Sequence, residues 1–363
     1  MPCDSKTVRV NIPGHDYHIA VLPGLLSDAG PRLRALTKSQ KAAIVTDSHV
    51  APLYAATLAA SVQSAGFQTI TATIPAGEQH KNLKTLSTIY DQIIPFGLDR
   101  STPLLALGGG VVGDMTGFAA ATILRGIPFI QIPTTLLAMV DASVGGKTGI
   151  DHALGKNLIG AFHQPLAVLI DPATLKTLPP RELRSGLAEC IKHDIIRDAP
   201  GFAQLERNIG RAIAMDVDYL ADLVAHNVAI KARVVENDPL EKSDRAHLNF
   251  GHTFGHAIET ISNYTYSHGE AVALGMIAAS RLAAMLAMID PPAVDRIVNV
   301  IAAAGLPTRG LTLSIDDLLA CMSFDKKTRS GRIRFVLPTA IGSVTIRDDI
   351  APDLVRAAVE SLR

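Results

Sequence analysis

The chain has 363 residues and no net charge, because its 34 lysines and arginines balance its 34 aspartates and glutamates. Hydrophobic residues make up 48% of the chain and charged residues 19%, which excludes disordered, collagen-like and coiled-coil proteins. The balanced charge gives no global field for nucleic acid or for an anionic membrane, and the length predicts two domains.

The amino-terminal half alternates short aliphatic runs with amphipathic segments. This rhythm predicts an α/β domain over residues 1–178, with a doubly wound, Rossmann-like parallel sheet and helices on both faces. The expected strands lie at 42–46, 67–74, 104–107, 127–132 and 167–170, and the expected helices lie near 53–65, 81–94 and 114–124.

From about Leu178 the pattern changes to long apolar-periodic stretches, which predict a mainly α-helical domain over residues 179–363. The helices are expected at 181–196, 212–235, 248–261 and 271–289, with a late hairpin at 332–337 and 343–346. Residues 271–289 contain Arg281 near their middle, so a buried helix is expected there rather than a membrane span.

The location is predicted from the amino terminus and the cysteines. The first residues carry charges and prolines in place of the apolar core of a secretory signal. Cys3, Cys190 and Cys321 are odd in number and widely separated, which does not fit a disulfide framework. A cytoplasmic protein is expected.

A glycine-rich turn, GGGVVGD at 108–114, follows one expected strand and leads into an expected helix. In that context it can hold a pyrophosphate on backbone amides at a helix amino terminus. A tight turn without a ligand is the alternative. The ribose-binding acid of the ordinary dinucleotide motif is missing about 20 residues downstream. Nucleotide contacts are therefore expected from earlier strand ends, at Asp47 and at the turn 75–81.

Residues 141–151 and the lysine at 156 form a polar, glycine-rich stretch that we interpret as an anion-binding loop, or alternatively as a mobile surface loop. Its GGKT sequence is not a P-loop, because neither Asp141 nor Ala142 supplies the first glycine of that motif.

His252 and His256 lie four residues apart, which puts both imidazoles on one face of a helix. Catalytic zinc sites often take three histidine or carboxylate ligands and leave a fourth position open. The spacing does not choose the ligands among His252, His256, His268, Glu189 and Glu270. The cations Arg125, Lys192, Lys231, Arg245 and Lys326 add the side chains that hold phosphate and carboxylate groups.

Several motifs in their joint order resemble the 3-dehydroquinate synthase family over nearly the whole chain. They are LGGGVVGD at 107–114, PTTLLAMVDASVGGKTGID at 133–151, GKNLIG at 155–160, LAECIK at 187–192, LNFGHTFGHAIE at 248–259 and HGEAVALGM at 268–276. The resemblance implies conversion of 3-deoxy-arabino-heptulosonate 7-phosphate to 3-dehydroquinate and phosphate, with catalytic NAD, with zinc or cobalt, and in a homodimer.

The resemblance also implies site residues. The metal positions are Glu189, His252 and His268. The residues implied to contact NAD are Asp47, Ala76, Gly77, Glu78, Lys81, Gly109, Gly110, Val111, Val112, Gly113, Asp114, Thr134, Thr135, Lys147, Lys156, Thr174, Leu175, Lys176 and Thr177. The residues implied to act on the substrate are Arg125 (from a second subunit), Asp141, Lys147, Asn157, Lys192, Lys231, Arg245, Asn249, His256 and Lys326.

Two departures from the family pattern occur, Asp194 where a glycine is common and the stretch 239–244 before Arg245. Related cyclases act on sedoheptulose 7-phosphate or glucose 6-phosphate and alter the positions that bind the carboxylate. Here Lys231, Arg245, Asn249 and His256 keep the dehydroquinate synthase pattern. A polyol dehydrogenase and a non-catalytic sugar-phosphate-binding protein are the competing hypotheses. Neither needs the full set of cations, ligands and cofactor residues.

Overall fold

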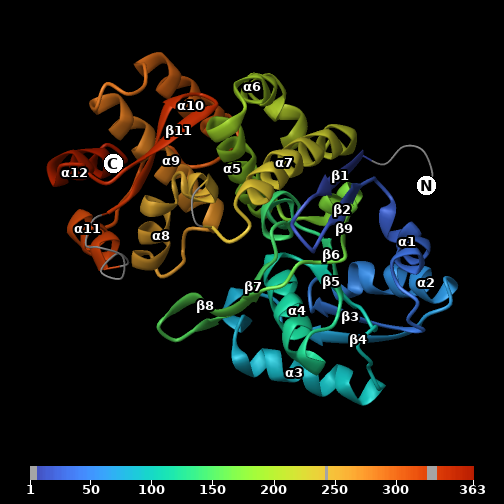
Figure 1. Ribbon diagram of the computed structural model, residues 1–363. Helices are drawn as coiled ribbons and strands as arrows, with labels where there is room; N and C mark the ends of the chain where they lie inside the picture. The colour runs from blue at the N-terminus through green and yellow to red at the C-terminus, as the bar shows by residue number, and fades with distance from the viewer. Residues whose placement is uncertain (1–5, 242–243, 325–332) are drawn as a thin grey trace. The chain divides into compact units, whose positions relative to one another are not determined.

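The computed structural model describes residues 6–241, 244–324 and 333–363 (Figure 1). The chain forms two compact units. Unit 1 contains residues 1–178 and 217–236, and unit 2 contains 179–216 and 237–363. The division after Leu178 lies at the expected joint, but the long helix from Val217 belongs mainly to unit 1 rather than to the second half.

Unit 1 is an α/β unit around a seven-stranded sheet, which confirms the predicted fold class. The sheet has the strand order β1-β2-β9-β6-β5-β3-β4, and every pair in it is parallel except β1 with β2. The strands are β1 (Lys6–Val10), β2 (Tyr17–Val21), β3 (Lys41–Asp47), β4 (Gln68–Ile74), β5 (Leu104–Gly108), β6 (Phe129–Pro133) and β9 (Ala167–Ile170).

Helices cover both faces of this sheet because neighbouring residues of each strand point to opposite sides. Ile44 of β3 packs with α1 (Ala29–Leu36) and α2 (Ala56–Ser64) in one apolar cluster. Val45, the next residue, packs with α3 (Leu83–Ile93) and α4 (Gly110–Thr122) in a second cluster. The near-continuous burial of β3 and β5 is typical of parallel strands between two helical layers.

The segment interpreted as a glycine-rich loop is instead a hairpin of β7 (Lys147–His152) and β8 (Gly155–Phe162). Two glycines in this segment allow the backbones of the paired strands to approach closely. A Cβ atom on Gly149 would lie 2.5 Å from the carbonyl oxygen of Ile159, and one on Gly160 would lie 2.2 Å from that of Thr148. The loop prediction was therefore wrong for 147–151 and for Lys156, because close strand pairing and loop flexibility both use glycine.

Short helical turns connect the elements of unit 1. They are η1 (Leu25–Asp28), η2 (Ala51–Ala55), η3 (Glu78–His80), η4 (Ile94–Phe96), η5 (Ile123–Arg125), η6 (Ala138–Ala142) and η7 (Pro172–Thr177). Helix α7 (Val217–Asn237) completes this unit with all but its last residue.

Unit 2 is mainly helical, as predicted, and α9 (His268–Met285) is its central element. Nearly every residue from Ala271 to Ala283 is buried, and α9 contacts α5, α8, α10, α12 and β10. The other elements are α5 (Pro180–Arg197), α6 (Ala199–Ile213), η8 (Asp244–Asn249), α8 (His252–Ile261), α10 (Pro291–Ala303), α11 (Ile315–Phe324), β10 (Phe335–Ala340), β11 (Ser343–Arg347) and α12 (Pro352–Glu360).

The predicted helix at 212–235 is wrong at its start, because two helices meet there. Helix α6 ends with Met215 in the left-handed conformation, at φ 59°, and Asp216 N–H donates back to the Arg211 carbonyl. This is a Schellman-type ending, in which Met215 occupies the position where glycine is more common. Periodicity alone did not show the break, since apolar residues continue across it.

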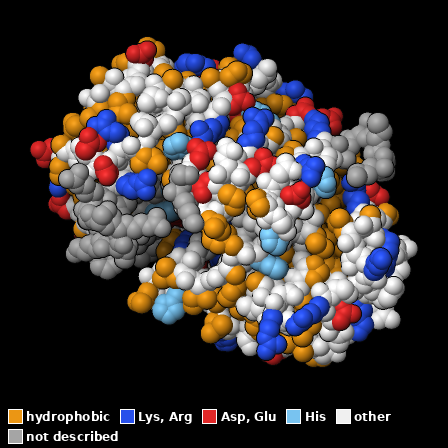
Figure 2. All heavy atoms as spheres, in the orientation of Figure 1, with side chains coloured by type: hydrophobic (Ala, Val, Ile, Leu, Met, Phe, Trp, Pro, Cys, Tyr) orange, Lys and Arg blue, Asp and Glu red, His pale blue; other side chains and the backbone are white. Residues whose placement is uncertain are grey.

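None of the helices in the described part of the chain combines the length and the apolar character needed to cross a bilayer. On the face drawn in Figure 2, Lys and Arg side chains are interspersed with Asp and Glu side chains and do not gather into one basic patch.

Candidate functional site

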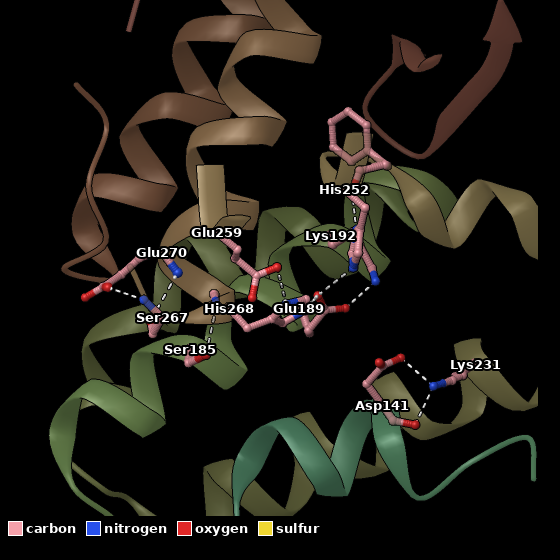
Figure 3. Close-up of polar contacts among 12 residues, drawn as sticks. Asp141, Ser185, Glu189, Lys192, Lys231, His252, Glu259, Ser267, His268 and Glu270 are labelled. Atoms are coloured by element: carbon pink, nitrogen blue, oxygen red, sulfur yellow. Dashed lines mark hydrogen bonds and ion pairs between the residues drawn. The ribbon is translucent and has the colours of Figure 1, made fainter. Parts of the chain in front are cut away.

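Three potential metal ligands converge in unit 2, each from a different helix (Figure 3). Glu189 lies on α5, His252 is the first residue of α8, and His268 is the first residue of α9. One ligand atom of each lies within 4.8 Å of the others. The Glu189 Oε1 atom is 3.7 Å from His252 Nε2 and 3.5 Å from His268 Nε2.

Helix caps fix where the two histidines lie. Gly251 precedes α8 at φ 78°, a conformation that side chains rarely adopt, and so starts the helix at His252. Ser267 and Glu270 form a capping box at the start of α9, which makes His268 its first residue. The sequence prediction began these helices at 248 and 271, because it followed apolar spacing and did not use these caps.

Glycines bring the three helices together at backbone distance. A Cβ atom on Gly269 would lie 2.3 Å from Ser185 Cα on α5. A Cβ atom on Gly275 would lie 2.0 Å from the carbonyl oxygen of Gly251, at the start of α8. Because α9 packs this tightly on both neighbours, the positions of the three ligands depend on rigid backbone contacts.

The charges in the cluster suit metal binding. Burial opposes the charge of Glu189, but Lys192 and the two histidines outweigh it and hold the pKa of that carboxyl well below its usual range. Lys192 forms an ion pair with Glu189 from the next turn of α5. Burial and the Lys192 cation lower the pKa of His252 well below its usual value. Glu189 is therefore ionised and His252 neutral, which are the forms that ligate metals.

The tautomer of His252 is set by its own backbone neighbourhood. Its Nδ1 atom lies 3.1 Å from the Phe250 carbonyl oxygen, which can only accept, so Nδ1 carries the proton. The Nε2 lone pair then faces Glu189. A neutral imidazole with a fixed tautomer is the ordinary preparation of a histidine ligand.

His268 differs because a carboxylate faces each of its ring nitrogens. Nε2 faces Glu189, and Nδ1 lies 3.5 Å from Glu259 Oε2. Burial lowers the pKa of His268, but the two carboxylates outweigh burial and raise that pKa to about 10. The proton on Nε2 is the one that a metal ion would displace.

The other two ligand candidates from the sequence lie outside this group. Glu270 is held by Arg181, at 2.6 Å, and by the capping box of α9. His256 is exposed, and its ring stands edge-on to that of His252 with 5.3 Å between centroids. Of the two histidines with i, i+4 spacing, His252 lies in the group of possible metal ligands and His256 does not.

Unit 1 gathers polar residues where its parallel strands end, which is one edge of the sheet. Asp47 ends β3, and its carboxylate accepts from the N–H groups of His49 and Val50. Residues 76–78 follow β4, the glycines of 108–113 connect β5 to α4, Thr134 and Thr135 follow β6, and residues 174–177 lie in η7 after β9.

The glycine turn is shaped by close contacts. A Cβ atom on Gly113 would lie 2.6 Å from the Gln131 side chain, and one on Gly109 would lie 3.2 Å from Thr135. The first helical residue of α4 is Gly110, so the N–H groups of residues 110–112 begin the helix without an acceptor in a preceding turn, while the Gly113 N–H donates to the Gly109 carbonyl. That arrangement suits an anionic group of a nucleotide.

Lys81 is buried and connects this turn to the hairpin. Its Nζ atom lies 2.6 Å from Asp114 Oδ2 on α4 and 2.6 Å from Asn157 Oδ1 on β8. Burial works against the charge of Lys81, but the neighbouring carboxylates of Asp114 and Glu78 outweigh it and raise the pKa of the amine. Glu78 also lies 3.7 Å from Lys156.

A second buried lysine of unit 1, Lys231 on α7, contacts both the side chain and the main-chain oxygen of Asp141 in η6 (Figure 3).

The remaining cations and Asn249 lie in separate elements. In unit 2 the Arg245 side chain is almost fully buried in η8 and donates to the Pro239 carbonyl at 3.0 Å. Asn249 ends η8, and Lys147 begins β7. Arg125 is exposed at φ 64° after α4. Lys326 and Arg332, the start of the expected hairpin, lie outside the described residues.

Sequence reasoning missed Glu259, the carboxylate that faces His268. The signal was present, because Glu259 is an acid in the apolar stretch of α8, as Glu189 is in α5. Only Glu189 was selected.

Comparisons with known proteins give one family. A family model described as 3-dehydroquinate synthase N-terminal matches residues 71–185, and one described as 3-dehydroquinate synthase C-terminal matches residues 186–328. A 3-dehydroquinate synthase of Microcystis aeruginosa is 47% identical over 352 residues, which cover 96% of each chain.

Solved structures share the fold over almost the whole chain. A 2-epi-5-epi-valiolone synthase from Streptomyces hygroscopicus, solved with NAD+ and Zn2+ bound, has a TM-score of 0.88 and 31% identity, with 95% of this chain and 96% of that chain covered. A 2-deoxy-scyllo-inosose synthase, solved with carbaglucose-6-phosphate, NAD+ and Co2+, has a TM-score of 0.89 at 24% identity, with 98% of this chain and all of that one covered.

Proposed function

The chain belongs to the 3-dehydroquinate synthase family, and from this premise we propose that it converts 3-deoxy-D-arabino-heptulosonate 7-phosphate to 3-dehydroquinate and phosphate. The cofactors in this proposal are NAD and a divalent metal ion, zinc or cobalt. The observation that carries the proposal is the cluster of one buried carboxylate and two imidazoles in a chain of this family.

The cluster passes a test of fit for such an ion. Both Glu189 oxygens are buried and make no hydrogen bond of ordinary geometry within the described residues, so their contacts are the ion pairs with Lys192 and the histidines. A donor set of one carboxylate and two histidines is a known catalytic zinc arrangement that leaves one position open. Glu189, His252 and His268 would hold the ion.

When bound, the metal ion supplies Lewis acidity toward a hydroxyl-bearing substrate and NAD supplies a reversible hydride acceptor. In our proposal the strand-end residues of unit 1 hold NAD, with the amides of 110–112 on an anionic group and with Lys81 fixing Asp114 beside them. The cofactor contacts at Asp47, Thr134, Lys156 and 174–177 belong to the same proposal.

The cations would bind the two anionic groups of the substrate. We assign the phosphate to Lys147, Asn157, Asn249 and His256, with Lys326 and a second subunit's Arg125 completing the set. Lys231 and Arg245 would hold the carboxylate. Both side chains are already buried and hydrogen-bonded, so they are preorganised and lose little conformational entropy when substrate binds. Lys192, which is paired with Glu189, would lie near the substrate carbonyl.

A homodimer is part of the proposal. The β7–β8 hairpin exposes large apolar side chains, with Leu154 at 86%, Leu158 at 62% and Phe162 at 51% of their full accessible surface. Exposed apolar side chains grouped on one hairpin favour burial against another protein surface, and here a second copy of the chain is the expected partner. Sedimentation of the wild type and of Leu158→Glu tests this, since the variant should shift toward monomer.

We also propose a cytoplasmic location, which the free thiols of Cys190 and Cys321 support. Fractionation of cells that produce the tagged chain would test it.

The test of the reaction is phosphate release from 3-deoxy-arabino-heptulosonate 7-phosphate by the purified protein with NAD. We expect release to stop after chelation and to return when zinc or cobalt is added. Sedoheptulose 7-phosphate, which lacks the carboxylate, is the matched control and should release little. No release from the acid substrate with metal and NAD restored would refute the proposal, and preference for the control would assign a different sugar phosphate.

A further inference from the structure

Glu259 is a buried carboxylate to which the proposed reaction gives no role. It lies in the last turn of α8, seven residues after His252, and only 6% of its surface is exposed. Seven residues are close to two helical turns, so His252 and Glu259 occupy the same face of α8. A buried carboxylate is costly without a compensating partner.

That partner is His268. The Glu259 Oε2 atom lies 3.5 Å from His268 Nδ1, and Figure 3 shows the carboxylate next to the imidazole on the side away from Glu189. The two nitrogens of one imidazole therefore face two different acids. Since Nε2 is the nitrogen that faces the metal cluster, Nδ1 is left as the donor to Glu259.

The two histidines of the cluster are supported differently. His252 has the main-chain carbonyl of Phe250 behind its Nδ1 atom, whereas His268 has an ionisable side chain. A carboxylate accepts a stronger hydrogen bond than a neutral carbonyl, and it increases the basicity of the opposite ring nitrogen.

We propose that Glu259 is a positioning residue of the metal centre, whose carboxylate accepts a hydrogen bond from His268 Nδ1 and so directs Nε2 toward the ion. This inference rests on the metal site of the proposed function. Glu259 itself does not bind the ion or the substrate. Its loss should weaken metal binding and leave the other two ligands in place.

The experiment measures the affinity of chelator-stripped protein for Zn2+ and for Co2+, by competition with a chromophoric chelator. Glu259→Gln keeps the volume but removes the charge, and we expect about 10-fold to 100-fold weaker binding, as for other partners of histidine ligands. The visible absorption of bound Co2+ should change as well, since the geometry of one ligand changes. Glu259→Asp keeps the carboxylate and should recover part of the affinity.

Glu270→Gln is the matched control. It makes the same change of charge two residues from His268, but Glu270 contacts Arg181 and the Ser267 N–H instead of the imidazole, and glutamine can keep that capping hydrogen bond. We expect its metal affinity to stay within about twofold of wild type, as for a residue outside the site. A purely structural role for Glu259 would instead lower the melting temperature of the metal-free protein and leave metal affinity unchanged.

Each outcome has a separate meaning. Wild-type affinity in a folded Glu259→Gln protein would overturn this inference. If Glu259→Gln does not fold, Glu259→Asp decides, because a folded variant with wild-type affinity and a wild-type Co2+ spectrum would overturn it too. If the wild-type protein binds no metal, or if His252→Ala binds it normally, the proposed metal site fails.

Discussion

The metal cluster of unit 2 and the strand-end site of unit 1 are stabilised in different ways. The ligands of the cluster extend from three helices that touch through glycine backbone, at Gly269 and Gly275. The strand-end residues of unit 1 lie in turns with close contacts of their own, at Gly109 and Gly113, and there a buried ion pair of Lys81 with Asp114 is added. The comparison indicates that both sites need close packing, and that unit 1 depends in addition on the charge of Lys81.

The largest effect should follow from removing a ligand. His252→Ala takes one imidazole from the cluster, and we expect activity to fall by about a thousandfold, close to 4 kcal/mol, because a metal ion contributes several kcal/mol to catalysis. Metal content should fall with it. His256→Ala is the control, because it removes the other imidazole of α8 and should keep the metal while losing activity. Full metal content in His252→Ala would contradict the assignment.

The second largest effect should follow from removing the ion pair of Lys81 with Asp114 in unit 1. Lys81→Met leaves the Asp114 carboxylate without its cation, and breaking a buried pair costs roughly 3 kcal/mol of unfolding free energy. Urea unfolding would measure this, together with KM for NAD, which should rise. Lys84→Met on the exposed side of α3 is the matched control. Equal stability of the two variants would show that the strand-end site does not depend on this charge.

The third prediction concerns the close helix contact in unit 2. Gly269→Ala places a methyl group against Ser185 on α5, and the overlap should cost about 2 kcal/mol and weaken metal binding. Gly210→Ala in α6 has open space around the new Cβ atom and should instead stabilise the protein by about 0.5 kcal/mol. Thermal or urea unfolding would measure both changes in the free energy of unfolding. Unchanged stability and metal binding in Gly269→Ala would refute the dependence on packing.

The smallest effect is a difference in thiol reactivity. Cys190 lies next to Glu189 on α5, and burial, aided by Asp194 and Glu189, raises the pKa of its thiol well above the usual value. In the native protein we expect a thiol reagent to label Cys190 about 100-fold more slowly than Cys321, which is less buried. Mass spectrometry of the labelled peptides measures the ratio. Fast labelling of Cys190 would mean that α5 opens, against the rigid packing inferred here.

The fold was predictable where a pattern repeats. The buried strands β3, β5, β6 and β9 were expected close to their observed bounds, because parallel strands read as apolar runs between turns. The edge pair β1 and β2 and the helices α10 to α12 were not, although α10 buries Val294, Ile297 and Ile301 at regular helical spacing, so a signal for that helix was present and was not used. The β7–β8 hairpin was misread because its glycines resemble those of a loop.

The candidate site was predictable in its residues more than in its grouping. The sequence places His252 near His256, but the described contacts group His252 with His268 and with Glu189, which is 63 positions away from it in the chain. Such grouping depends on tertiary packing at Gly269 and Gly275, which spacing along the chain does not encode. Glu259 could have been selected as an acid in an apolar stretch, but its contact with His268 depends on tertiary packing as well.

The most direct test of the central claim is the fate of NAD during turnover. Purified protein with metal is given 3-deoxy-arabino-heptulosonate 7-phosphate in large excess over NAD, and phosphate and NADH are followed together. We expect phosphate release to continue far beyond the amount of NAD present, with no accumulation of NADH. Phosphate release that stops when NAD is exhausted, or NADH formed in proportion to substrate consumed, would contradict it.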